Sequence, residues 1–171
     1  MLKIWEKFKT WHEGRIDWWM YRLNLDEYSA YWISFFKGIK ISCVDTWTGS
    51  DEHNGINFDL IEKNFDQNVK PLKDNKILTK FKMTSDKFFD QNKNKFDFIY
   101  LDGDHSNKQV QKDLLNSWSF LKSNGFLLID DYMWWYYKDL KNNPASAVNS
   151  FLIENIDQIK KMVIWHQVLL Q

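Results

Sequence analysis

Acidic residues stand at the ends of three apolar segments in this chain of 171 residues. Asp45 ends ISCVD, Asp102 ends FDFIYLD, and Asp130 and Asp131 follow FLLI. The second of these acids opens the sequence D-G-D-H, so that His105 follows within the same short stretch. Carboxylates repel one another and bind a hard cation such as Mg²⁺ well, whereas histidine exchanges protons near neutral pH. These residue types indicate metal-assisted proton transfer, provided that the fold brings them together.

The segments between these acids alternate between two patterns. Short apolar runs without polar alternation are typical of strands buried on both faces, and amphipathic runs indicate helices. We expect strands over residues 39–44, 77–81, 96–101 and 126–129, helices over 58–65, 85–90, 106–121 and 145–156, and a closing hairpin from 162–165 and 168–170. Ser85 is a candidate helix N-cap, and Gly125 suits a left-handed turn before the fourth strand. This order predicts an α/β fold with a mostly parallel sheet, helices on both faces and a C-terminal antiparallel hairpin.

The predicted sheet explains how distant acids could form one site. The carboxyl ends of parallel strands lie at the same edge, and ligands bind in the crevice there. We therefore expect the strand-end carboxylates to gather around a cation such as Mg²⁺, with His105 or Asp104 taking a proton beside it. Asp45 ends a separate strand, where an acid can hydrogen-bond both hydroxyl groups of a ribose.

Each of these residues also has a simpler interpretation. An aspartate after a strand is often a turn former or a helix cap, which applies to Asp45 and to Asp104 before the helix that begins near Ser106. A lone histidine such as His105 is more often a surface residue. Two adjacent acids at one strand end and D-G-D-H at another favour a shared site over separate caps.

The composition bounds the other functions. Basic and acidic residues balance at 23 each, so the bulk charge gives no sign of nucleic-acid binding. The single cysteine, Cys43, excludes a disulfide framework and fits a reducing, cytoplasmic location. The most apolar stretch, residues 28–36, is far shorter than a membrane span and is expected to be a buried helix. Residues 1–13 have an amphipathic pattern, which favours a helix docked on the body of a single domain over a helix that binds a membrane surface or a partner.

A resemblance to a known family is carried by FDFIYLDGDHSNKQVQKDLLNSWSFLKSNGFLLIDDYMW, and also by ISCVDTWTGSDEHN upstream. These segments resemble the class I S-adenosylmethionine-dependent methyltransferases, in particular the metal-dependent O-methyltransferase branch that includes the macrocin and cephalosporin-tailoring enzymes. The resemblance covers roughly residue 39 to the C-terminus. It implies a Rossmann-like three-layer sandwich in one domain, with residues 1–36 as an aromatic-rich N-terminal helical segment and 37–171 as the family-like core.

The resemblance also implies a role for individual residues. The cofactor-binding residues would be Asp45, Thr46, Trp47, Thr84, Ser85 and Asp102; the Mg²⁺ ligands would be Asp102, Asp130 and Asp131; and the general base would be His105 or Asp104. The implied reaction is methyl transfer from S-adenosylmethionine to a hydroxyl group of a small molecule, for example a sugar or glycoside. A homo-oligomer is compatible with this activity.

One part of the chain departs from the family pattern. The family's first strand normally ends in E-I-G-x-x-x-G, whereas the corresponding residues 18–36 contain no glycine. We therefore expect a degenerate first strand and loop, and a catalytically degenerate binding or scaffold protein stays open as an alternative function. A hydrolase acting on phosphates is a weaker alternative, because no Walker-type phosphate loop is present. Residues 134–137 are interpreted as a wall of the acceptor pocket, or else as a loop that packs on its own aromatic side chains.

Overall fold

The computed structural model describes residues 17–21, 38–49, 53 and 55–171. The helices expected within residues 1–13 and 28–36 lie outside the described residues, as does the segment that follows the first strand. Among the described residues, no helix is both long enough and apolar enough to cross a membrane.

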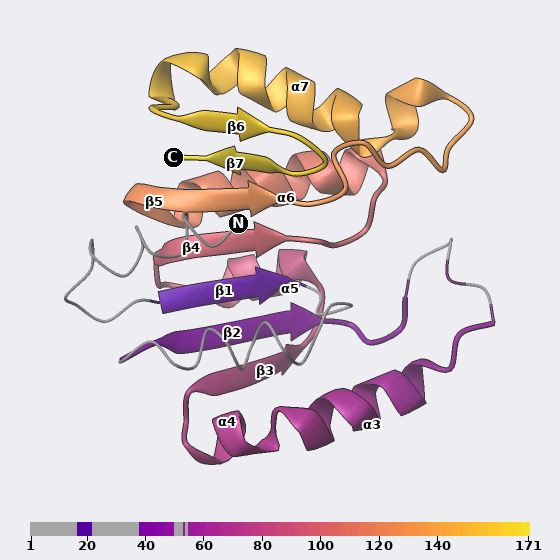
Figure 1. Ribbon diagram of the computed structural model, residues 1–171, viewed down its shortest axis with the longest axis vertical. Coiled ribbons are helices and arrows are strands. Elements are labelled where there is room, and N and C mark those ends of the chain that lie inside the picture. Colours follow the sequence, from indigo (N-terminus) through magenta and orange to yellow (C-terminus); the bar gives the residue numbers. More distant parts are fainter. Residues whose placement is uncertain (1–16, 22–37, 50–52, 54) are drawn as a thin grey trace.

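In the described part of the chain, a seven-stranded sheet forms the centre (Figure 1). Its strands are β1 (Asp17–Tyr21), β2 (Lys40–Asp45), β3 (Leu78–Lys82), β4 (Phe96–Leu101), β5 (Leu121–Ile129), β6 (Met162–Ile164) and β7 (Val168–Leu170). The strand order is β3-β2-β1-β4-β5-β7-β6. The first five strands are parallel, whereas β7 runs antiparallel to both β5 and β6. The predicted mostly parallel sheet with a C-terminal hairpin is thus confirmed.

The first strand is present in the chain despite its unusual sequence. β1 lies at the centre of the sheet and pairs in parallel with β2 on one side and β4 on the other. The aromatic-rich N-terminal segment, residues 1–36, therefore supplies a central strand of the same sheet that carries the acids.

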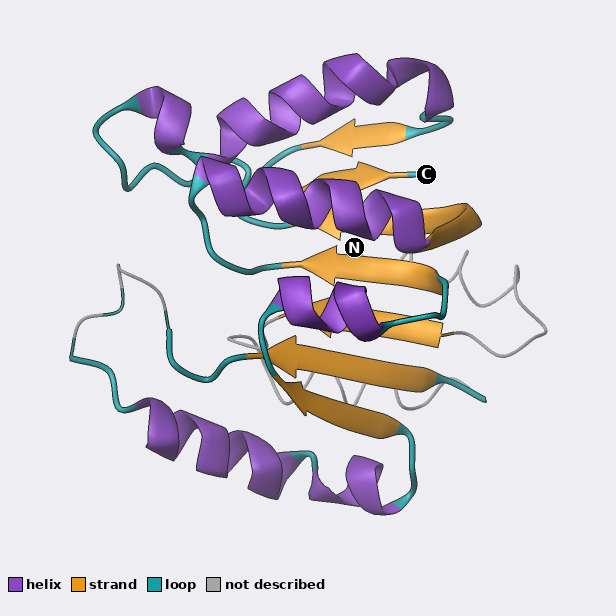
Figure 2. Cartoon of the chain, turned by 180° about the vertical axis from the view of Figure 1, so that it is seen from behind, coloured by secondary structure: helices purple, strands orange, loops and turns teal. Residues whose placement is uncertain are grey.

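Helices cover both faces of this sheet (Figures 1 and 2). They are α3 (Phe58–Asn68), α4 (Lys70–Asp74), α5 (Ser85–Gln91), α6 (Asn107–Phe120) and α7 (Pro144–Asn155), with 3₁₀ turns at Leu140–Asn142 and Ile156–Gln158. Residues from α3 and α4 belong to one apolar cluster, and residues from α5, α6 and α7 belong to another. The sheet lies between the two clusters, which gives the three-layer sandwich.

Alternation along the central strands explains why both faces are apolar. In β4, Phe98 and Tyr100 belong to the cluster under α3 and α4, whereas Ile99 and Leu101 belong to the cluster under α6 and α7. Consecutive side chains of a strand point to opposite faces, so a strand buried on both sides must be apolar at every position. The strand ends at Leu101, and Asp102, which is still only 8% exposed, is the first acid beyond it.

The structure corrects two local predictions. Thr84, not Ser85, is the N-cap of α5, because its Oγ1 accepts a hydrogen bond from the backbone nitrogen of Lys87 at 3.3 Å. The left-handed residue before the apolar part of β5 is Asn124, with φ of 63°, not Gly125. Asparagine tolerates that conformation better than most side chains do.

Gly125 is required for a different reason. A methyl group at this position would lie 2.9 Å from the Lys122 carbonyl oxygen and 3.0 Å from that of Asp97. Both neighbours are backbone atoms, so neither can move aside without disturbing the sheet.

We expect Gly125→Ala to lower the free energy of unfolding by about 1–3 kcal/mol because of this overpacking. Urea denaturation would measure the loss. Gly55→Ala measures a different effect, since its φ of +80° strains any side chain although an added methyl group meets no described atom within 4 Å. A loss below about 0.5 kcal/mol in Gly125→Ala would show that the β4–β5 backbone relaxes around the added methyl group.

Candidate functional site

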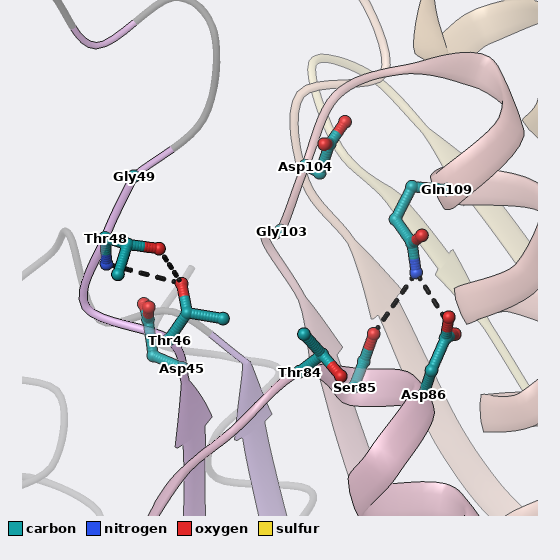
Figure 3. A pocket seen from close by; sticks show the side chains of 10 residues that line it. All are labelled: Asp45, Thr46, Thr48, Gly49, Thr84, Ser85, Asp86, Gly103, Asp104 and Gln109. Carbon is teal, nitrogen blue, oxygen red and sulfur yellow. Dashed lines mark hydrogen bonds between the residues drawn. The ribbon is translucent and has the colours of Figure 1, made fainter.

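A polar cavity of about 190 Å³ opens at the carboxyl edge of the sheet (Figure 3). Its walls come from the end of β2 and the loop after it, the start of α5, the loop after β4 and the first turn of α6. The residues that line it are Asp45, Thr46, Thr48, Gly49, Thr84, Ser85, Asp86, Gly103, Asp104 and Gln109. Four of the predicted cofactor residues, Asp45, Thr46, Thr84 and Ser85, are thus in one place.

Trp47 lies apart from the other predicted cofactor residues. Its backbone has φ of 53°, and its nitrogen donates a hydrogen bond of 2.7 Å to Asp45 Oδ1. The indole is buried against Phe65, with ring centroids 5.2 Å apart, and Lys80 Nζ lies 4.2 Å from the ring centroid. The left-handed turn therefore directs Trp47 into the core under α3, while Thr46 lines the cavity.

Gly49 lies in the loop after β2 and lines the cavity beside Thr46 and Thr48. It has φ of +74°, and a methyl group there would lie 2.2 Å from the Phe58 ring. Glycine is favoured at this position, because the backbone conformation strains a side chain and the Phe58 ring would have to shift to admit one.

Sequence reasoning missed a buried polar network beneath the cavity. Gln109 Nε2 donates to Asp113 Oδ1 at 3.1 Å, to Ser85 Oγ at 3.3 Å and to Asp86 Oδ1 at 3.4 Å. Asp113 is only 3% exposed and Ser85 is fully buried. The sequence signal for this network is Asp113 itself, an acid directly before Leu114 at a position of the predicted helix that faces the core.

Burial raises the pKa of the Asp113 carboxyl to about 7, although hydrogen bonds with Ser85 and Gln109 oppose the shift. Asp86 and Asp104 raise this pKa further through their negative charges. Asp113 therefore changes charge near neutral pH, unlike an ordinary aspartate.

A second cluster lies on the other side of the D-G-D-H segment. His105 Nε2 is 3.0 Å from Asp131 Oδ2 and 3.7 Å from Asp102 Oδ1. One ligand atom from each of the three residues lies within 4.8 Å of the others. Burial raises the pKa of Asp102, the hydrogen bond with His105 lowers it, and Asp130 and Asp131 raise it again. Two carboxylates and an imidazole at this spacing suit a divalent cation.

The adjacent acids Asp130 and Asp131 have different surroundings. Asp130 Oδ2 accepts hydrogen bonds from the Tyr100 hydroxyl group and, at 3.0 Å, from Gln167 Nε2. Asp131 has φ of 51°, a conformation that side chains rarely adopt. The turn at Asp131 directs its carboxylate to His105, whereas Asp130 is held between β4 and the closing hairpin.

Asp104 lines the cavity and also has a local role. Its Oδ1 accepts a hydrogen bond of 2.7 Å from the backbone nitrogen of Ser106, just before α6. Asp104 is therefore a turn former before the helix and not its cap, because the N-cap of α6 is Ser106 and no side chain caps this end. His105 is 9% exposed, which excludes the surface interpretation of that histidine.

An aromatic segment borders the His105 cluster. The ring centroids of Trp134 and His105 are 5.2 Å apart. The backbone nitrogen of Trp134 donates a hydrogen bond of 2.9 Å to the Asp131 carbonyl oxygen. We call residues 133–139 the aromatic loop. Its side chains are exposed apart from that of Tyr137, which is half-buried, and Trp135 is 83% exposed.

The strand order is that of a Rossmann-like fold, and the cavity lies at the edge of the sheet where such folds bind their ligands. A family profile described as a methyltransferase domain matches residues 19–132, which is more than half of the chain. The chain therefore belongs to this methyltransferase family. No curated protein sequence matches the chain significantly.

Several solved structures share the fold. One is the MycE methyltransferase from the mycinamycin biosynthetic pathway, in complex with Mg, SAH and mycinamycin VI, with a TM-score of 0.66 and 15% identity. The match covers 99% of this chain and 48% of MycE, so the chain spans about half the length of that protein. Another is the O-methyltransferase TomG from Streptomyces achromogenes, which is involved in tomaymycin synthesis and was solved with SAM. It has a TM-score of 0.63 and 6% identity, and the match covers 99% of this chain and 77% of TomG. An O-methyltransferase from Bacillus cereus in complex with SAH has a TM-score of 0.61 and 10% identity, and the match covers 99% of this chain and 78% of that protein.

We expect Asp113→Asn to stabilise the fold at pH values above neutral. The pKa of Asp113 is raised from 3.8 to about 7 on folding, so the wild type loses stability as the pH rises through this interval. A neutral amide avoids that loss, which is on the order of 4 kcal/mol.

Urea denaturation at about pH 8, and again towards pH 4, would test this effect. The advantage of Asp113→Asn should be largest at the higher pH and shrink at the lower one. Asp74→Asn on the exposed end of α4 is the matched control. A variant less stable than the wild type at the higher pH would contradict burial as the dominant effect.

Proposed function

We propose that this protein transfers a methyl group from S-adenosylmethionine to a hydroxyl group of a small molecule, in a reaction assisted by a divalent cation such as Mg²⁺. One observation carries the proposal. The D-G-D-H segment contributes Gly103 and Asp104 to the cavity that Asp45 lines, and Asp102 and His105 to the acidic cluster. A cofactor in the first site would therefore lie beside a metal and a base in the second.

The cavity suits the nucleoside part of the cofactor. Asp45 accepts a hydrogen bond from Trp47 through Oδ1 and lines the cavity, where its carboxylate would accept hydrogen bonds from ribose hydroxyl groups. Thr46, Thr84 and Ser85 would lie along the nucleoside, and Asp102 at its far end. Trp47 would act indirectly, by fixing the turn that holds Asp45.

The acidic cluster suits the chemical step. A bound divalent cation would lower the pKa of an acceptor hydroxyl group, and S-adenosylmethionine would supply the electrophilic methyl group. Asp102 and Asp131 would hold the cation, with Asp130 as the further carboxylate beside them. His105 would take the hydroxyl proton, and Asp131, 3.0 Å from its Nε2, would orient the imidazole. Asp104 is the alternative base, but the cluster favours His105.

The aromatic loop supports an acceptor with a ring. Trp134 lies against His105, where the acceptor hydroxyl group must arrive. The buried side chain of Asn143 holds the loop by accepting from the backbone nitrogens of Tyr136 and Tyr137 and donating to the Tyr137 carbonyl oxygen. Exposed aromatic rings on a fixed loop suit the apolar face of a sugar or glycoside. The proposal places the reaction in the cytoplasm and is compatible with a homo-oligomer.

The cofactor assignment predicts that the wild type binds S-adenosylhomocysteine and that Asp45→Asn binds it at least about tenfold more weakly. The amide keeps an acceptor for the Trp47 nitrogen but loses the charge that strengthens bonds to the ribose. Calorimetric titration would measure both affinities, with Asp74→Asn as the control. A folded wild-type protein that binds no S-adenosylhomocysteine would favour the degenerate scaffold over the enzyme.

The metal assignment predicts unequal effects of the two adjacent acids. Asp131→Asn should weaken Mg²⁺ binding by about tenfold or more, because it removes a ligand from the cluster. Asp130→Asn should have a smaller effect, since Tyr100 and Gln167 engage that carboxylate. Titrations with Mg²⁺ and with Mn²⁺ would measure both variants. Equal losses would make Asp130 a direct ligand, and much tighter binding of Mn²⁺ would indicate that the His105 nitrogen also coordinates.

A further inference from the structure

We infer that Asp113 is a positioning residue for the cofactor cavity: it fixes the Gln109 amide and the Ser85 hydroxyl group on the cavity wall. The inference rests on the proposed function, because it assigns this cavity to the cofactor. Asp113 would act through its neighbours, because it lies beneath the cavity wall rather than on it.

The geometry of the Gln109 amide carries the inference. Its nitrogen faces three acceptors, on Asp113, Ser85 and Asp86, at 3.1–3.4 Å. Figure 3 shows this nitrogen directed towards Ser85 and Asp86 at the base of the cavity. An amide turned by 180° would bring its own oxygen against the ionised carboxylates of Asp113 and Asp86, so these two charges favour one orientation of the amide. Asp113 lies one helical turn after Gln109 and is the most buried of the acceptors that carry a charge.

Asp113 is costly to keep in this position. A buried carboxylate without a cation is unfavourable, and an apolar or amide side chain would relieve the cost. The charged groups around it increase the cost: Asp86 approaches from α5 and Asp104 from the loop before α6. Lys112 pairs with Asp86 at 3.0 Å, on the exposed side of α6. The small cavity that Asp113 lines on its other side is shared with Asp102, His105 and Asp130.

Protonation should change what Asp113 does for its neighbours. The ionised carboxylate only accepts hydrogen bonds, so it holds the amide nitrogen of Gln109 firmly. The protonated form has a donor of its own and is a weaker acceptor, so the amide is held less firmly. The cavity wall should therefore be best ordered above the pKa of Asp113, which is about 7.

Calorimetric titration with S-adenosylhomocysteine at about pH 6 and about pH 8 tests this inference. The wild type should bind about threefold to tenfold more tightly at the higher pH, the difference between a charged and a neutral acceptor. Asp113→Asn, which mimics the protonated form, should show the weaker affinity at both pH values. Asp97→Asn is the matched control, because Asp97 pairs with Lys122 in β4–β5 and lines no part of the cavity.

A second measurement does not depend on the cofactor. The side-chain amide NMR signal of Gln109, identified by its absence in Gln109→Met, should titrate with a midpoint near pH 7 in the wild type but not in Asp113→Asn. A signal that is insensitive to Asp113→Asn, or the same pH dependence of binding in both proteins, would overturn the inference. Absence of cofactor binding together with a normal Gln109 titration would overturn the proposed function and leave the network intact.

Discussion

Repulsion between carboxylates at the carboxyl edge of the sheet is the constraint that shapes this molecule. Parallel strands buried on both faces must be apolar along their length, so polar groups collect where the strands end. Here the ends of β2, β4 and β5 all carry aspartate, and β4 and β5 are neighbours in the sheet. The pKa of Asp102 is raised as a result, because burial and the nearby acids disfavour its charged form. The fold thus creates an anionic site that a cation would stabilise.

The D-G-D-H segment divides this edge into two sites. The two inner residues of the segment, Gly103 and Asp104, line the cavity, and the two outer residues, Asp102 and His105, belong to the cluster. Asp104 also accepts from the Ser106 nitrogen, which fixes the entry into α6. A change in the position of this segment would therefore alter both sites together. The proposed reaction would need a methyl donor and a proton acceptor to be aligned, and one short segment between them would achieve this more simply than two separate loops.

Much of this arrangement could be predicted from the sequence because it follows from strand ends. The apolar runs predicted the strands. The ends of these strands predicted that Asp45, Asp102 and the Asp130–Asp131 pair lie at one edge of the sheet. The directions of individual side chains could not be predicted, because they depend on left-handed turns at non-glycine residues. Such turns send Trp47 into the core and Asp131 towards His105. Local sequence preferences do not favour these conformations, so the surrounding packing must impose them.

Asp113 shows a further limit of sequence patterns. Within an amphipathic helix, a single acid among apolar neighbours can be an exposed residue at the margin of the apolar face or a buried one. Only the packing of α5 against α6 distinguishes the two, because Ser85 and Gln109 exist as partners only once these helices meet. Its burial next to a cavity rich in acids lowers stability and yet gives the wall a single arrangement of donors. Stability and order of the site are thus opposed at this residue, and retention of the acid is understandable if order in the cavity is what the fold must provide.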